Sequence, residues 1–145
     1  MKELFRLYEQ AANGNSEAMV FLLAFHAYCH GIDDMIDGDT EKSSENILDI
    51  LMQANALYTT PFYQAHWIRL GGIIAHVTNT YADSVAWEKS EEPWKRNVSD
   101  VIRQCGNDMV LAVAAITSGY RGMRNLSLKL REFAWKNQHP EATSA

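Results

Sequence analysis

Apolar residues recur along the chain at the three- and four-residue spacing of amphipathic α-helices, and no alternating run indicates a β-strand. Breaks rich in Asn, Gly, Ser, Thr and Pro divide this pattern, so we expect helices over about residues 2–12, 16–37, 44–58, 62–89 and 93–118. Gly119 and Gly122 should end the fifth helix before a last one, and Gly71–Gly72 are a possible kink in the fourth. Ser16 is the expected N-cap of the second helix and Gly38 its end. The pattern predicts an all-α fold, a single antiparallel bundle of five or six helices.

Length and composition fit one domain over residues 1–145, with a flexible tail over about 138–145. The two cysteines give neither a disulfide framework nor a zinc spacing, which favours a reducing, cytoplasmic location. The longest apolar run, residues 19–25, is too short to span a bilayer. The N-terminal residues lack the apolar core of a signal peptide.

The formal charge of −5 is unevenly distributed. Residues 1–92 carry five basic and fourteen acidic side chains, whereas residues 93–145 carry eight basic and four acidic ones. Ordinary solvated helix faces account for this, but so does an acidic, metal-holding half combined with a basic, anion-holding half. The basic residues are spread out without a recognised motif, so nucleic acid is not an expected partner.

The end of the second helix carries an unusual polar stripe. At 100° per residue, His26, His30, Asp33 and Asp37 fall within about 60° of arc, and Asp34 lies at the edge. The stripe continues the apolar face of the first half of the helix, so the carboxylates should point inward, where they repel one another unless a cation meets them. Aspartates at a helix C-terminus also oppose the macrodipole. We expect a metal or ligand site here, and the imidazoles would complete a transition-metal site with Asp33; the alternative is a solvated helix end.

Residues 28–37 read Tyr-Cys-His-Gly-Ile-Asp-Asp-Met-Ile-Asp, which resembles the first aspartate-rich motif, Tyr-Cys-Arg-x-x-Asp-Asp-x-x-Asp, of the squalene and phytoene synthases in the isoprenoid synthase superfamily. Residues 71–83 resemble their second motif, in which Leu-Thr-Asn precedes an Asp four residues after the Asn. In that family both motifs line a helical cavity and bind magnesium ions that hold a prenyl diphosphate. The resemblance implies magnesium-binding roles for Asp33, Asp34, Asp37, Asn79 and Asp83.

Other candidates lie elsewhere on the predicted helices. His76 and Asp83 lie opposite the apolar stripe of the fourth helix, so they face water if that stripe faces the core. Asp108 interrupts an apolar face of the fifth helix, as a surface carboxylate or as a further ligand-binding group. Arg121 and Arg124 are suited to hold a phosphate, because guanidinium groups donate in a bidentate fork.

Two functions therefore stay open. The first is magnesium-dependent binding or turnover of a diphosphate-bearing small molecule, with magnesium suggested by the all-oxygen ligands. The alternative is a non-catalytic helical binding or assembly protein; the sequence leaves open whether the chain is an enzyme. We also expect a homodimer, because 145 residues are about half of what the resembled cavity-forming fold needs and small residues flank the polar face of the fourth helix.

Overall fold

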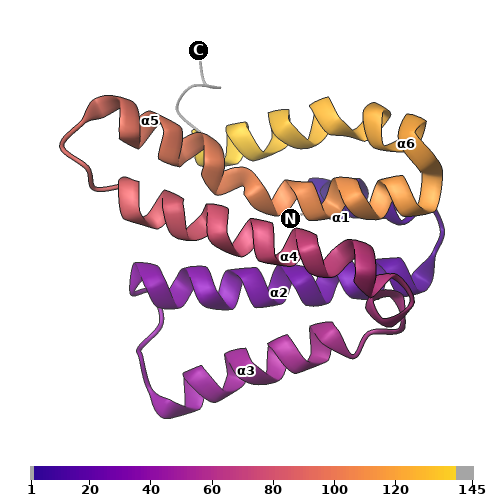
Figure 1. Cartoon of the computed structure of the whole chain (residues 1–145), viewed down its shortest axis with the longest axis horizontal. Coiled ribbons are helices and arrows are strands. Elements are labelled where there is room, and N and C mark those ends of the chain that lie inside the picture. The colour runs from indigo at the N-terminus through magenta and orange to yellow at the C-terminus, as the bar shows by residue number, and fades with distance from the viewer. Residues whose placement is uncertain (1, 140–145) are drawn as a thin grey trace. The chain divides into compact units, whose positions relative to one another are not determined.

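The computed structural model describes residues 2–139, and over these residues its regular secondary structure is helical, without a strand (Figure 1). The all-α prediction is therefore confirmed. The elements are α1 (Lys2–Ala12), α2 (Ser16–Asp37), α3 (Ser44–Tyr58), α4 (Pro61–Trp87), α5 (Pro93–Ile102), the short 3-10 helix η1 (Arg103–Cys105) and α6 (Gly106–Gln138). Gln138 is the last residue of α6, and residues 140–145 of the predicted tail lie outside the described residues.

The ends of α2 and α3 follow from short-range hydrogen bonds. Asn15, one residue before the expected Ser16, is the N-cap of α2, because its side-chain oxygen accepts from the backbone N–H of Ala18 at 3.0 Å. Gly38 ends α2 in the left-handed conformation, at φ 85°, as predicted. Ser43 caps α3 by accepting from the backbone N–H of Asn46 at 3.2 Å.

The interruptions inside the longer helices match the expectations only in part. Gly119 adopts φ 69° and ψ −173°, a conformation that favours glycine, and the chain reverses there within α6. A Cβ atom at Gly122 would lie 2.2 Å from the Cβ of Ser118, so the turn needs this second glycine. The kink expected at Gly71–Gly72 is wrong, since the non-helical residue of α4 is His66. The expected continuous helix over 93–118 is also wrong, because η1 separates α5 from α6.

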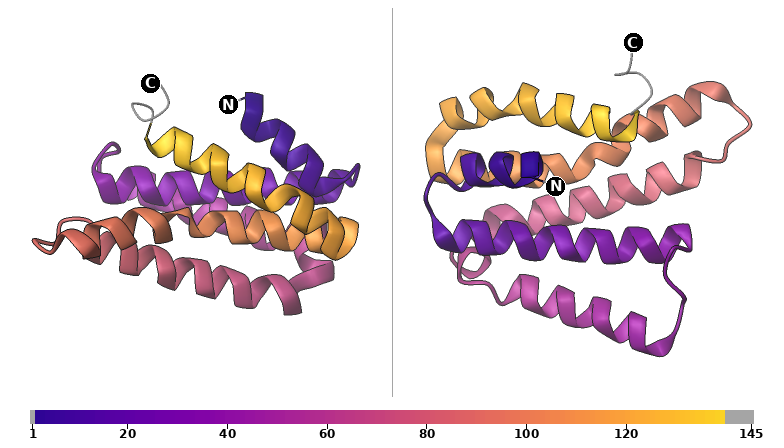
Figure 2. Two further views of the ribbon diagram at one scale, coloured as in Figure 1. Left: turned by 90° about the horizontal axis from the view of Figure 1, so that it is seen from above. Right: turned by 180° about the vertical axis from the view of Figure 1, so that it is seen from behind.

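The chain forms two compact units, residues 1–14 with 68–145 and residues 15–67. In the first unit, α1 packs against α6, and the Thr117 hydroxyl donates to the carbonyl of Ala11 at 2.6 Å. The two halves of α6 double back on each other (Figure 2), and Gln104 just before α6 donates to Gln138 at its end, at 2.9 Å. The buried apolar side chains of this unit include Leu7, Leu70, Ile74, Val77, Met109, Val113, Leu126 and Leu130.

The second unit contains α2, α3 and the first turns of α4. Its aromatic cluster joins α2 to α4, with the rings of Phe21 and Phe62 5.7 Å apart, and both side chains are buried. α3 runs beside α2 (Figure 1) and buries Leu57 completely. Over the described residues, neither unit has a helix with the length and apolarity needed to cross a membrane.

Candidate functional site

The polar stripe of α2 lies on the second unit; it begins half-buried at His26 and ends exposed at Asp37, but exposure does not rise steadily between them. His26, Asp33 and Asp34 are half-buried, whereas His30 and Asp37 are exposed. The imidazole rings of His26 and His30 are 4.4 Å apart in an edge-to-face arrangement. Burial first, and then the neighbouring His30, lowers the pKa of His26, which favours the neutral form of its imidazole.

The stripe does not form a preorganised metal centre. Within residues 2–139, no three His, Cys, Asp or Glu side chains gather closely enough to hold a metal ion. Magnesium needs near-octahedral oxygen ligands, and residues Asp33, Asp34 and Asp37 would have to change rotamers or recruit waters and phosphate oxygens to supply them. The magnesium prediction therefore stays a prediction.

The second predicted stretch lies on the part of α4 that belongs to the first unit. Asn79 and Asp83 are both exposed, and the Asn79 amide donates to the Asp83 carboxylate at 3.3 Å, one helical turn away. His76 is exposed as well, while Leu70, Ile74 and Val77 are buried. The expectation that His76 and Asp83 face away from the apolar stripe of this helix is confirmed.

Asp108 is half-buried and has a histidine and an arginine as neighbours, which the sequence alone did not indicate. Its carboxylate oxygens lie 3.9 Å from His76 Nε2 and 3.9 Å from Arg131 Nη2. Cys105, one turn earlier, is buried, and its thiol lies 3.4 Å from the carbonyl of Val77. Burial and then the charge of Asp108 raise the pKa of this thiol, so it stays protonated at neutral pH.

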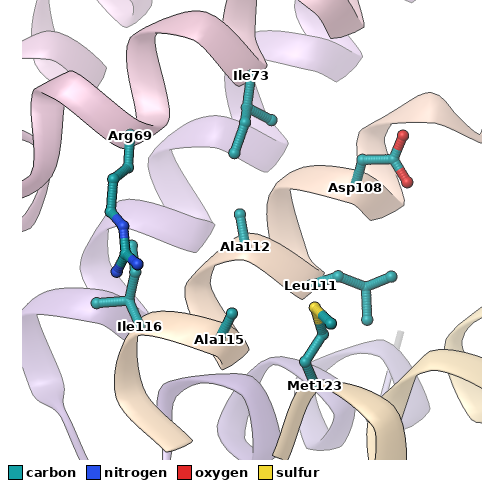
Figure 3. Close-up of a pocket in the computed structure, with 8 residues that line it drawn as sticks. All are labelled: Arg69, Ile73, Asp108, Leu111, Ala112, Ala115, Ile116 and Met123. Carbon is teal, nitrogen blue, oxygen red and sulfur yellow. The ribbon is translucent and has the colours of Figure 1, made fainter. Parts of the chain in front are cut away.

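A shallow groove of about 390 Å³ runs between α4 and α6 in the same unit. Figure 3 shows Arg69 and Asp108 on opposite sides of it, with the carboxylate turned away from the apolar lining. The lining consists of Arg69, Ile73, Asp108, Leu111, Ala112, Ala115, Ile116 and Met123. Arg69 has no match among the residues expected from sequence, and small apolar side chains at helical spacing do not by themselves indicate a groove.

Arg121 and Arg124 are both exposed and follow the reversal at Gly119. They lie on the outer side of the second half of α6, among exposed apolar and aromatic residues rather than beside the groove lining. Neither arginine lines the groove between α4 and α6. Their expected role as phosphate ligands stays a prediction.

The most distinctive surface of the second unit was not expected from the sequence. Four large apolar side chains of α3 point away from α2, and we call them the α3 face: Ile47 is 45% exposed, Leu48 59%, Leu51 55% and Met52 65%. The opposite side of α3 contacts α2: a Cβ atom at Gly31 of α2 would lie 2.8 Å from Oε1 of Gln53 and 3.3 Å from Cγ1 of Ile50. This helix thus turns a glutamine toward its neighbour and four large apolar side chains toward solvent.

The chain was compared with models of protein families, with curated proteins and with solved structures, and none of the three comparisons gave a match.

Proposed function

We propose that this chain is a self-assembling helical protein and that the α3 face binds another copy of it. The observation that carries the proposal is the exposure of Ile47, Leu48, Leu51 and Met52 on one side of one helix. Large apolar side chains grouped in this way typically mark an interaction surface, whereas isolated ones need no explanation. The sequence placed the dimer contact on the polar face of α4, but α3 offers far more exposed apolar surface.

The gain from covering this face is modest. Burying a leucine, isoleucine or methionine completely is worth about 1.5–3 kcal/mol, and these four side chains keep about half of their exposure. Covering them would therefore yield roughly 1 kcal/mol each, or about 4 kcal/mol in total, before the cost of association. One pair of helix faces is also smaller than the roughly 1,200–2,000 Å² of a standard interface. About 4 kcal/mol corresponds to a dissociation constant near 1 mM, so tighter assembly requires further contacts around this face, such as those of charged side chains.

The proposal also covers the arrangement of the helices and the cellular location. The helices form one antiparallel bundle, as the periodicity indicates, and the protein acts in the cytoplasm. Cys29 and Cys105, the two cysteines of the sequence, are not joined in a disulfide, which favours a reducing location.

Sedimentation velocity over about 5–500 µM protein tests the assembly. The wild type should form species heavier than the 16.4 kDa monomer as its concentration rises. Leu48→Gln/Met52→Gln should stay monomeric, and Ala56→Gln, at an exposed position of the same helix, should behave like the wild type. A wild type that remains at 16.4 kDa throughout would contradict the proposal.

A second candidate function is the binding of a diphosphate-bearing small molecule through magnesium at Asp33, Asp34 and Asp37. The half-burial of Asp33 and Asp34 favours it, because partly desolvated carboxylates at consecutive positions gain from a cation. The metal would neutralise charge on the diphosphate if the chain turns its ligand over.

Thermal unfolding with and without about 5 mM magnesium and pyrophosphate tests this candidate. Ligands that bind only the folded state raise the melting temperature, and Asp34→Asn/Asp37→Asn should abolish the rise. Zinc in place of magnesium tests the site of His26, His30 and Asp33, whose affinity should fall below about pH 6. Identical melting curves under all conditions would remove the metal from the account.

A further inference from the structure

The charge around the α3 face indicates what kind of surface fits it. Residues 15–67 carry eight acidic side chains and a single basic one, a formal balance of −7. Two of the acidic residues, Glu45 and Asp49, lie on α3 itself and are exposed. At 100° per residue they flank the α3 face on the side of Met52. The surface is therefore apolar in its centre and acidic along one edge.

This edge disfavours pairing between two α3 faces. In a two-fold contact, the surface of each copy meets the same surface of the other. When two identical helices pair antiparallel, each flank meets its own equivalent, so the edge with Glu45 and Asp49 would meet the same edge of the second copy. Like charges at such positions oppose association. A complementary surface must instead combine apolar and basic side chains.

The first unit carries such a surface. On the outer side of the second half of α6, five exposed side chains follow one another at spacings of three and four residues, and we call them the α6 stripe: Tyr120, Arg124, Leu128, Arg131 and Trp135. These residues lie within about 80° of arc on the helix. Residues 120–138 carry five basic side chains and one acidic one. The α6 stripe is thus apolar and basic, the counterpart of the α3 face.

We propose that the α3 face of one copy binds the α6 stripe of another copy. The inference rests on the proposed assembly function and specifies its geometry. At 1.5 Å per residue the α3 face spans about 8 Å and the α6 stripe about 22 Å, so the stripe is long enough to cover the whole face. Each chain carries both surfaces, so the contact is head-to-tail rather than two-fold. Such contacts form rings or open chains of copies.

A complementation experiment tests this geometry. The first variant, Leu48→Gln/Met52→Gln, loses the α3 face but keeps the α6 stripe, and the second, Leu128→Gln/Trp135→Gln, loses the stripe but keeps the face. All substituted positions are exposed, and circular dichroism and thermal unfolding of each variant check that it folds. Lys129→Gln, an exposed residue of α6 outside the stripe, is the matched control and should assemble like the wild type.

Each variant alone should sediment as a monomer, while an equimolar mixture should form a dimer of about twice 16.4 kDa and stop there. If the stripe variant alone still assembles as well as the wild type, the α6 stripe is not the partner, although assembly through α3 stands. If the wild type and the mixture both remain monomeric, the assembly function itself fails.

Salt gives an independent readout of the same contact. Screening weakens attraction between exposed opposite charges and relieves repulsion between like charges. Raising the salt concentration from about 50 to 500 mM should weaken wild-type association several-fold if an acidic face meets a basic stripe. Association that strengthens with salt would overturn the pairing of α3 with α6 in favour of pairing between identical faces.

Discussion

Leu51 and Leu57 allow the two sides of α3 to be compared with one kind of substitution. Leu57 is completely buried, whereas Leu51 is 55% exposed, and the two leucines lie on the same helix in the same unit. We replace each by alanine and measure the free energy of unfolding in urea, first at a protein concentration of about 1 µM, where weak assembly is absent.

The exposure of each side chain sets the expected loss. Replacing a fully buried leucine with alanine typically costs about 2–5 kcal/mol, because it removes transfer free energy and leaves a cavity. Leu51 keeps more than half of its surface in water, so Leu51→Ala should cost about 1 kcal/mol or less. Alanine is also a slightly better helix former than leucine, which offsets part of this loss.

The concentration dependence then distinguishes an interface from ordinary surface. Near 300 µM protein, assembly should stabilise the wild type by mass action, and Leu51→Ala should lose that extra stability. Leu57→Ala should cost the same free energy of unfolding at both concentrations. The reasoning is refuted if Leu51→Ala costs as much as Leu57→Ala at 1 µM, because that result would mean that the chain itself covers the α3 face.

Three further predictions concern single positions. Gln53→Met should raise the free energy of unfolding by about 1 kcal/mol, because the buried Oε1 of Gln53 accepts no hydrogen bond from the described residues; a decrease in urea denaturation would contradict this. Gly119→Ala should lower the free energy of unfolding by about 1–2 kcal/mol, because Gly119 has φ 69°. Gly72→Ala, where the added Cβ atom meets open space on a helix, should raise it by up to about 1 kcal/mol. Equal melting temperatures for the two variants would refute the assignment of the turn. The pKa of His26 is lowered in the folded state, so the unfolded chain binds the extra proton first as the pH falls. The free energy of unfolding should therefore decrease as the pH drops through about 6.5. His26→Gln should flatten this pH dependence between about pH 7 and 5.

Local signals in the sequence predicted most helix boundaries. Gly38 and Gly119 were read correctly because each adopts a positive φ that favours glycine, and Gly122 because a side chain there would clash with Ser118. The kink at His66 could not be predicted, because histidine has no intrinsic preference for a break and its conformation depends on tertiary contacts. The adjacent Gly71 and Gly72, which looked like the better candidates, remain helical.

The orientation of α3 was hidden for a different reason. Its large apolar residues spread over more than half of the circumference of the helix, so periodicity alone does not say which part of that surface is buried. Ile50 and Leu57 turn inward, while Leu48 and Met52 turn outward. A helix with so wide an apolar surface is typically covered by two neighbours. Here α2 covers one part of the surface, and the α3 face stays exposed.

The candidate site on α2 was predicted as a single stripe on one side of the helix, and its side chains differ in how deeply they are buried. What the sequence could not supply is the ligand geometry. Distances among carboxylates depend on rotamers and on the cation itself, neither of which helical spacing determines.

The most direct test of the central claim is the oxidation rate of Met52 by hydrogen peroxide, followed by mass spectrometry at increasing protein concentration. Methionine oxidises at a rate set by its access to solvent, and Met52 is 65% exposed, whereas Met35 in the same unit is half-buried and serves as the internal reference. The account predicts rapid oxidation of Met52 at about 1 µM and protection of several-fold near 300 µM, with no change at Met35. An oxidation rate for Met52 that does not depend on protein concentration would contradict the claim that another copy covers the α3 face.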